Sequence, residues 1–388
     1  MLAIINGKIL TIETDIIENG TVLIEDGKIK AVGDSNLEIP EEAEVIDAKG
    51  QWVTPGFIDA HAHIGLFGEP KVPATADGNE KTGPVKAELR GIDSLNPNDP
   101  AFPQVFKAGV TTVYTGPGSS NIIGGTGFAM KTVGETAYDM VIPNTEAMKF
   151  ALGENPKRNY KERNQMPATR MGNAAVFRMA FIKAQNYEKN MQEAKEKGEP
   201  FDRDLANEAL LKVLNREMRA RIHCHRADDI ITAIRLAEEF NLDYTLEHCT
   251  EGYKVTDILS EKNIQCVIGP LLMGPAKQEL WDVRMTTPAE MEKAGVEFAI
   301  MVDASSDTKY LNVQTGLAVR YGLSEEAAFK SITINPAKII GIDNKVGSLK
   351  EGKDADIVIW DGHPLSNLTH TEKVIIDGKI VYDRSEEK

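Results

Sequence analysis

Both ends of the chain consist of short runs in which hydrophobic and polar residues alternate. Three such runs lie within residues 1–55 and two within residues 345–388, separated by Asn-Gly, Asp-Gly and Lys-Gly dipeptides that favour tight turns. The turn sequence Asp-Gly-Lys occurs at residues 26–28 and again at 377–379. Because either end alone would bury little apolar surface, we predict that residues 1–55 and 345–388 together form one small β-sandwich domain.

The middle of the chain, residues 56–344, has a different pattern. Eight short apolar runs alternate with segments whose apolar residues recur at helical spacing, such as residues 226–242 and 324–342. This alternation favours parallel strands joined by crossover helices, and eight such units favour a (β/α)8 barrel. A long, charged, helical segment at residues 169–219 is expected to be an insertion after the fourth run. The third run, at residues 128–134, is rich in glycine and is either a strand or a loop.

Five of the seven histidines fall in three short clusters, each at the end of an apolar run. His61 and His63 end the first run, His223 and His225 the fifth, and His248 the sixth. Alternate residues of a strand point to the same face, and the catalytic residues of barrels lie at the carboxyl ends of the strands. We therefore expect these side chains to meet. Imidazole is the commonest protein ligand for transition metals, so the pattern predicts a metal site.

A carboxylate is expected to complete this site. Asp303 ends the eighth apolar run, which is an unusual position because aspartate disfavours strands. Asp307 is an alternative a few residues further on. A carboxylate beside a metal-bound water can accept its proton. We predict Asp303 as a metal ligand and as the general base.

Composition narrows the range of partners. The 388 residues carry a formal net charge of −15, which argues against nucleic acid or an anionic membrane as the main partner. The chain has neither a basic leader nor a long apolar run, and its three cysteines fit a reducing compartment better than a disulfide framework. We expect a cytoplasmic protein with a small-molecule substrate, and homo-oligomer formation stays open. Cys224 and Cys249 adjoin the histidines, and we expect them to be small buried residues.

The motifs together resemble those of the amidohydrolase superfamily, and within it the imidazolonepropionase-like branch that includes dipeptidases. The resemblance depends on PGFIDAHAH at residues 55–63, the fifth-run histidine, the Glu-His pair at 247–248, Asp303 and the segment 346–365. It covers nearly the whole chain. It implies a distorted (β/α)8 TIM barrel, one or two divalent metal ions that are usually zinc, and hydrolysis of amide or related C–N bonds. By this resemblance the metal ligands are His61, His63, His223, His248 and Asp303.

The resemblance leaves the ligand from the fourth strand open. Members with two metal ions carry a bridging glutamate or a lysine carboxylated on its amine at this position. Lys149 and Glu154 are the candidates here, and Lys131 in the third run is a weaker one.

Three further residues are candidates for contacts with substrate. His225 is expected to face the same cavity as His223, where it would polarise the substrate carbonyl group or hold the substrate. Arg170 and Arg226 follow the fourth and fifth strands and could bind a substrate carboxylate through two hydrogen bonds. An internal ion pair is the alternative, above all for Arg226, since two aspartates follow it closely.

We therefore expect a metal-dependent amidohydrolase that cleaves an amide-type C–N bond in an N-acyl amino acid, a dipeptide or a cyclic amide. A deaminase or cyclic imidate hydrolase with one metal ion is the nearest alternative. The alternative from another class is a non-catalytic scaffold on the same fold, which should have lost metal ligands that this chain keeps.

Overall fold

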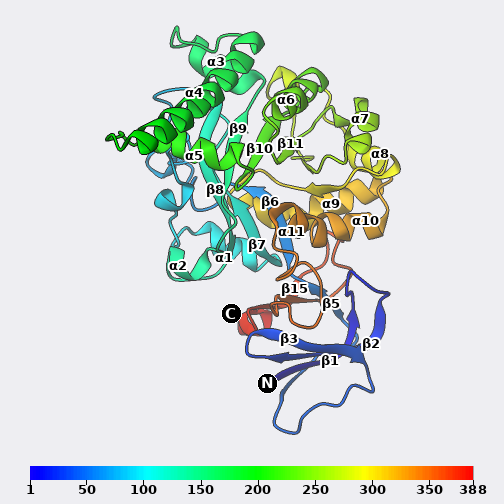
Figure 1. Ribbon diagram of the computed structural model, residues 1–388. Coiled ribbons are helices and arrows are strands. Elements are labelled where there is room, and N and C mark those ends of the chain that lie inside the picture. The colour runs from blue at the N-terminus through cyan, green and yellow to red at the C-terminus, as the bar shows by residue number, and fades with distance from the viewer. Residues whose placement is uncertain (388) are drawn as a thin grey trace.

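The computed structural model describes residues 1–387, and Figure 1 shows a barrel surrounded by helices above a smaller domain made of strands. The smaller domain is built from both ends of the chain. Its strands pair in the order β16-β15-β14-β5-β1-β2-β3, with β4 beside β1. They are β1 Leu2–Ile9, β2 Ile17–Glu25, β3 Lys28–Asp34, β4 Glu44–Asp47, β5 Trp52–Pro55, β14 Ile357–Trp360, β15 Thr371–Ile376 and β16 Lys379–Asp383.

One apolar core joins the two ends of the chain. Ile4, Val22 and Val53 from the N-terminal strands pack with Ile357 and Ile375 from the C-terminal strands. The prediction of a strand-rich sandwich domain shared between the termini is confirmed. The exact division at residues 55/56 and 344/345 stays a prediction.

The repeated Asp-Gly-Lys sequences form the tight turns of two hairpins, between β2 and β3 and between β15 and β16. Asp26, Gly27, Asp377 and Gly378 all have φ between 48° and 78°, as the turn type favoured by Asp-Gly requires. The two turns touch: a Cβ on Gly378 would lie 2.9 Å from the Gly27 Cα atom. Glycine is therefore needed at residue 378 for close approach as well as for backbone conformation.

The eight apolar runs of the middle segment form one sheet in the order β13-β12-β11-β10-β9-β8-β7-β6. Contacts between β13 and β6 bring its edges together, so the sheet is a nearly closed, distorted barrel, as predicted. The strands are β6 Phe57–Ala62, β7 Val110–Thr115, β8 Ile123–Lys131, β9 Ala147–Ala151, β10 Arg219–Cys224, β11 Tyr244–His248, β12 Cys266–Ile268 and β13 Phe298–Ile300.

Strand β8 differs from the expected parallel pattern, because it pairs antiparallel with both β7 and β9. A parallel connection needs a crossover of a dozen or more residues, whereas only residues 116–122 separate β7 from β8. The glycine-rich third run is thus a strand, but a reversed one. Its last residue, Lys131, consequently lies at the opposite end of the barrel from the ends of the parallel strands.

Helices cover the outside of the barrel (Figure 1). They are α1 Ala101–Phe106, α2 Ala137–Met140, α3 Glu154–Lys161, α4 Arg170–Lys197, α5 Leu205–Leu214, α6 Ala227–Glu239, α7 Thr256–Glu261, α8 Thr287–Lys293, α9 Leu311–Arg320, α10 Glu325–Ser331 and α11 Ile334–Ile340. The short 3-10 helices are η1 Pro73–Thr75, η2 Gly91–Ser94, η3 Gly252–Lys254, η4 Gln278–Leu280, η5 Ser306–Tyr310 and η6 Arg384–Glu386. Within residues 1–387, no helix combines the length and apolar character needed to cross a membrane.

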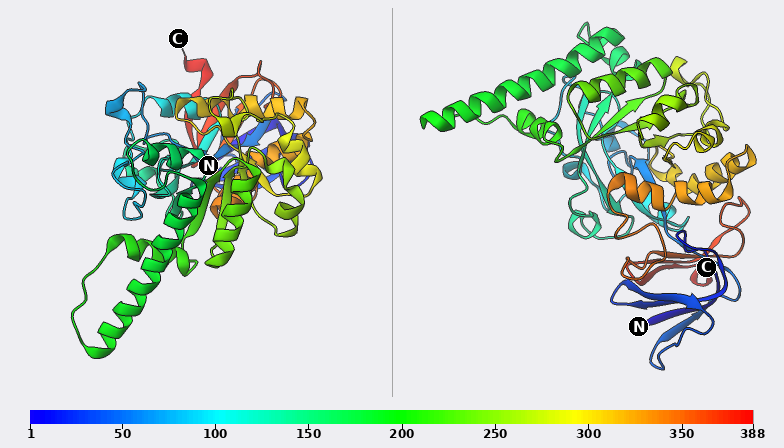
Figure 2. Two further views of the ribbon diagram at one scale, coloured as in Figure 1. Left: turned by 90° about the horizontal axis from the view of Figure 1, so that it is seen from above. Right: turned by 45° about the vertical axis from the view of Figure 1, so that its right-hand side comes forward.

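The predicted insertion at residues 169–219 contains α4 and α5, and α4 projects well beyond the barrel (Figure 2).

The segment 324–342, which has apolar residues at helical spacing, forms two helices instead of one. Ser324 begins the first as an N-cap, with its Oγ accepting a hydrogen bond from the Ala327 amide. The break precedes α11 because Pro336 cannot donate to the carbonyl oxygen of Ile332. That oxygen instead accepts the Ile58 amide of β6.

Candidate metal centre

The first group of possible metal ligands comes from the first and last strands of the barrel. His61 is in β6, His63 follows that strand directly, and Asp303 follows β13. Asp303 Oδ1 lies 3.0 Å from His63 Nε2 and 3.4 Å from His61 Nε2. One ligand atom from each of the three residues lies within 4.8 Å of the others. This set fits a single divalent ion bound by two imidazoles and a carboxylate.

The outer ring nitrogens of both histidines are held by neighbouring groups. His61 Nδ1 lies 2.6 Å from Glu247 Oε2, and His63 Nδ1 lies 2.8 Å from the carbonyl oxygen of Gly116. The Arg221 Nε donates to Glu247 Oε1 over 3.0 Å. Although burial raises the pKa of Glu247, the charge of Arg221 and the contact with His61 bring that pKa far below its ordinary value. An ionised Glu247 fixes the His61 ring with Nε2 turned inward, which is how carboxylates support histidine ligands.

Two of the candidate residues have an unusual backbone conformation. Asp303 has φ of 58° and His248 has φ of 73°, in the left-handed region that costs a non-glycine residue about 1–3 kcal/mol. The buried Asp59 carboxylate accepts the amides of both His61 and Val302, over 3.0 and 3.1 Å. It thereby ties the end of β13 to β6 and fixes the chain just before Asp303.

The second group of possible ligands comes from β10, β11 and the residue after β10. The ring centroids of His223, His225 and His248 lie 4.2–4.6 Å apart, and one nitrogen of each lies within 4.8 Å of the others. His225 Nδ1 contacts Thr250 Oγ1 over 2.8 Å, and His248 Nδ1 contacts the Gly269 carbonyl oxygen over 2.9 Å. Neither ring nitrogen of the buried His223 has a hydrogen-bond partner among the described residues.

The three rings of this second group are neutral. Burial is the main cause that lowers the pKa of His223, His225 and His248 well below the ordinary value, and the neighbouring imidazoles and lysines add to it. Neutral imidazole is the form that binds a metal. The unpaired nitrogens of His223 are costly in a buried position unless they bind something. The residues present therefore fit a metal ion.

Lys149, not Glu154, lies beside the histidines. Lys149 is in β9, and its Nζ is buried 3.2 Å from His61 Nε2. Burial lowers its pKa to about 8, even though Glu247 and Asp303 raise it. Glu154 is the first residue of α3, and its carboxylate lies 3.8 Å from Arg158, outside the cavity lining. Lys131 binds Asp356 at the other end of the barrel, because β8 is reversed.

Comparison with known proteins agrees with this geometry. A model of the amidohydrolase family matches residues 52–381. The chain belongs to the amidohydrolase family. It is a hydrolase that acts on C–N bonds.

Several relatives of this amidohydrolase span nearly its whole length. The crystal structure of an amidohydrolase from Thermotoga maritima MSB8 has a TM-score of 0.95 and 43% sequence identity, over 99% of this chain and all of that one. The amidohydrolase tasK of Hapsidospora irregularis is 31% identical over 94% of this chain, which spans only 40% of that longer protein. The imidazolonepropionase of Fusobacterium nucleatum is 25% identical, over 95% of this chain and 93% of its own length.

Arg170 and Arg226 both lie in internal ion pairs. Arg170 Nε lies 3.0 Å from both carboxylate oxygens of Asp229, and Arg226 makes two contacts of 2.9 Å with Asp228. Neither arginine lines the cavity above the histidines. Their predicted role in binding a substrate carboxylate therefore has no support in their positions.

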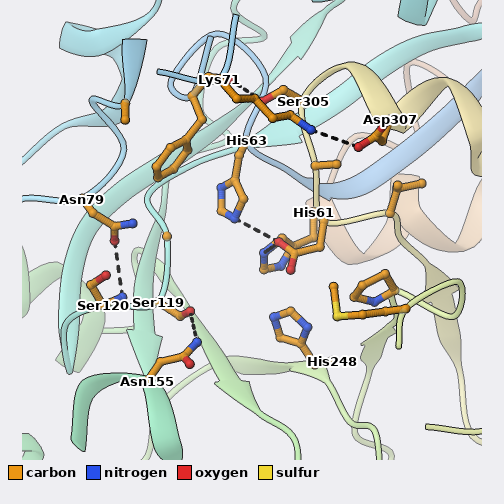
Figure 3. Close-up of a pocket in the computed structure, with 18 of the residues that line it drawn as sticks. His61, His63, Lys71, Asn79, Ser119, Ser120, Asn155, His248, Ser305 and Asp307 are labelled. Carbon is orange, nitrogen blue, oxygen red and sulfur yellow. Dashed lines mark hydrogen bonds and ion pairs between the residues drawn. The ribbon is translucent and has the colours of Figure 1, made fainter. Parts of the chain in front are cut away.

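The cavity of the amidohydrolase has a volume of about 940 Å³ and lies above His61, His63, His248 and Asp303. Figure 3 shows the three histidines at its floor and a polar wall to one side. That wall consists of Asn79, Ser119, Ser120 and Asn155, joined in pairs by hydrogen bonds. Lys81 and Arg158 also line the cavity, at positions that the sequence alone does not mark.

Two residues after β12, the partly buried Lys277 and the fully buried Glu279, also lie near the centre, and sequence reasoning missed them. Lys277 Nζ lies 3.2 Å from His225 Nε2 and 2.6 Å from Glu279 Oε1. Glu279 is in η4, and its side chain is fully buried. Both come from a loop without regular alternation, so no pattern in the sequence points to them. His225 itself does not line the cavity, which argues against its predicted contact with the substrate carbonyl group.

Proposed function

We propose that this hydrolase requires a divalent metal, with zinc as the expected ion, and cleaves amide-type C–N bonds in small substrates. The observation that carries the proposal is that two groups of possible ligands lie next to each other, with the His61 and His248 rings 5.1 Å apart, and that His61, His63, His248 and Asp303 line one cavity. His61, His63 and Asp303 would hold one ion, and His223 and His248 would contribute to a second. A bound divalent metal lowers the pKa of a coordinated water toward neutrality and polarises a carbonyl group.

Asp303 is the proposed general base. Burial raises its pKa, but its contacts with His61 and His63 and the charge of His248 bring the pKa well below the ordinary value. The carboxylate is therefore ionised and can take a proton from the attacking water. It would then pass that proton to the leaving nitrogen, because it lies at the cavity floor where the scissile bond must sit.

We propose substrates that carry a carboxylate, such as N-acyl amino acids or dipeptides, ahead of cyclic amides. Lys81 and Arg158 line the cavity as cations, and the polar wall beside them offers amide and hydroxyl groups. Lys71, another lining cation, is paired with Asp307 over 3.1 Å, and Arg158 has a longer contact of 3.8 Å with Glu154. A carboxylate held by Lys81 or Arg158 would place the rest of a short substrate over the floor.

The test is a substrate panel with controlled metal content. We expect chelated protein to be inactive and zinc-reloaded protein to hydrolyse N-acyl amino acids or dipeptides, with uncharged amides turned over more slowly. Turnover of aminopurines or cyclic ureides in place of amides would favour the deaminase or cyclic imidate hydrolase. A protein that holds no metal as isolated and hydrolyses nothing after reloading would favour the non-catalytic scaffold.

We also propose that Lys149 is carboxylated on its amine. Carboxylation needs a neutral amine, and burial lowers the pKa of Lys149 to about 8 beside His61. We expect native mass spectrometry to show an added CO2, and a carbamate carbon signal to appear in NMR spectra after growth with 13C-bicarbonate. The Lys149→Met variant is the matched control and should lack both. Unmodified wild-type protein would leave Lys149 as a plain amine.

A further inference from the structure

The hydrogen bonds of the polar wall have a fixed direction, which is set by Lys277 from outside the cavity lining. An ammonium group has three hydrogens and no lone pair, so it can only donate. Lys277 Nζ lies 2.6 Å from Glu279 Oε1, 3.2 Å from His225 Nε2 and 3.1 Å from Asn155 Oδ1. These three contacts use its three hydrogens, so Lys277 has none left for a substrate.

The contact with Lys277 determines how Asn155 meets Ser119. Because the Asn155 oxygen faces a donor, its amide nitrogen is the atom that lies 2.8 Å from Ser119 Oγ (Figure 3). That nitrogen donates, so the Ser119 oxygen accepts. The Ser119 hydroxyl donates to no group within residues 1–387, and Ser119 lines the cavity. Ser119 therefore offers a hydrogen-bond donor to a molecule in the cavity.

Asn79 presents a second donor by the same argument. The backbone amide of Ser120 can only donate, and it lies 3.3 Å from Asn79 Oδ1. The Asn79 nitrogen keeps two hydrogens that no group of the described chain accepts, and Asn79 also lines the cavity. The Gly118 amide donates to the Gly78 carbonyl oxygen over 2.9 Å. This bond holds the segment with Asn79 against the loop with Ser119, so both donors belong to one wall.

Lys277 is itself held in place by Glu279. The Glu279 side chain is fully buried, and its second oxygen accepts the Glu154 amide at the start of α3 over 2.9 Å. Asn155 is the next residue of that helix. The loop after β12 and the helix that carries Asn155 are therefore tied together. Turning the Asn155 oxygen away from Lys277 would break a hydrogen bond to a charged group, which is among the stronger kinds.

We propose that Ser119 and Asn79 are specificity-determining donors that select a carboxylate on the substrate. Lys277 is a positioning residue that acts through Asn155. This inference rests on the proposed function and deepens it, because it names the residues that distinguish a carboxylate from a neutral group of similar shape. An ionised carboxylate has two acceptor oxygens and no hydrogen, so it can accept from more than one donor. A neutral alcohol or amide brings hydrogens of its own, for which these two side chains offer no matching acceptor.

The test uses two ligands that contain no C–N bond and so cannot be hydrolysed. Levulinate is the isostere of N-acetylglycine with a methylene group in place of the amide nitrogen. Its alcohol analogue carries a neutral hydroxymethyl group in place of the carboxylate. Calorimetric titration of the zinc-loaded enzyme gives the ratio of the two Kd values. We expect wild type to prefer levulinate, and Ser119→Ala to reduce that preference about tenfold, the effect of losing one hydrogen bond to a charged group.

Asn155→Asp tests the direction of the hydrogen bond while keeping the shape of the wall. A carboxylate at residue 155 can only accept, so Ser119 must donate to it and is lost as a donor to the ligand. Asn159→Asp is the matched control for the added charge, because Asn159 also lines the cavity from α3 but contacts the Ser120 carbonyl oxygen. We expect Asn155→Asp to reduce the preference for levulinate about tenfold more than Asn159→Asp does. In a Ser119→Ala background the two variants should have equal effects.

Lys277→Met should also reduce the preference for levulinate, since it frees the Asn155 amide to turn. Lys277→Arg should restore it, because a guanidinium group likewise only donates. A merely structural role of Lys277 would change the thermal unfolding midpoint and leave the ratio of Kd values of the folded protein as in wild type.

Equal or absent binding of the two ligands by wild type would overturn the inference. So would a difference between Asn155→Asp and Asn159→Asp that persists in the Ser119→Ala background, because the effect would then not pass through Ser119. An enzyme that cleaves amides but shows no preference for levulinate would leave the proposed function standing without the inference. A protein that prefers levulinate through Ser119 and cleaves no C–N bond would contradict the proposed function and not the inference.

Discussion

Replacing Asp303 with asparagine should lower kcat by about 10²–10⁴-fold, the usual contribution of a general base, while the protein keeps its metal. Asparagine preserves an oxygen at the position 3.0 Å from His63 Nε2, so it can still accept a hydrogen bond or bind a cation. It cannot take a proton from water. The check is kcat on the best substrate of the panel, together with metal content by elemental analysis.

Asp307 is the alternative candidate for the general base. It also lines the cavity, but its carboxylate is half exposed and paired with Lys71 over 3.1 Å. We expect Asp307→Asn to change kcat much less than Asp303→Asn. A large loss in Asp307→Asn, with Asp303→Asn still active, would move the role of base to Asp307. Equal thermal unfolding midpoints of the two variants would exclude a folding defect as the cause.

Replacing Lys131 with methionine should destabilise the protein by about 3–5 kcal/mol, the cost of removing one partner from a buried ion pair. Lys131 is 4% exposed and joins the reversed end of β8 to the domain formed by the termini. Its Nζ lies 2.7 Å from Asp356 and 3.1 Å from both Asp354 and Asp377. Without it, the buried Asp356 carboxylate would lack a cation. The free energy of unfolding from denaturant titration measures the loss.

The pH dependence of the same variant gives a second measurement. Burial already raises the pKa of Asp356, and the charge of Lys131 opposes that rise. Without Lys131 the folded-state pKa should rise further above the unfolded-state value. A carboxyl group whose pKa is higher in the folded state than in the unfolded state stabilises the fold when it is protonated. This contribution to the free energy of unfolding is complete below the unfolded-state pKa and disappears as the pH rises through the folded-state pKa. Lys131→Met should therefore regain stability relative to wild type as the pH falls toward 4.

Lys28→Met is the matched control for Lys131. Lys28 also pairs with Asp354, but its side chain is 51% exposed. Exposed ion pairs contribute about 0–1 kcal/mol, so this control should stay close to wild type. Equal losses in Lys28→Met and Lys131→Met would contradict the view that burial makes the Lys131 contacts important.

The local amino-acid sequence was sufficient to predict much of the fold and several of the candidate metal ligands. The Asp-Gly turns fix two hairpins because that dipeptide tolerates positive φ. The alternation of apolar runs with helical segments determined a barrel, and histidines at strand ends are brought together at one rim of the barrel by its geometry alone. His61, His63, His248 and Asp303 could be named in this way, since each follows or ends an apolar run. The choice of His223 over His225 came from the resemblance to the amidohydrolase superfamily, because both residues end the fifth run.

Tertiary structure decided what depends on partners distant in sequence. The reversal of β8 follows from a connection too short for a crossover, and it moved Lys131 to a cluster of aspartates at residues 354–377. Arg170 and Arg226 looked available for substrate, but each is paired with an aspartate of α6. Lys277 and Glu279 come from an irregular loop, where no periodicity indicates which way a side chain points. Alternation could place His225 on the same face as His223, but only packing shows what covers its ring.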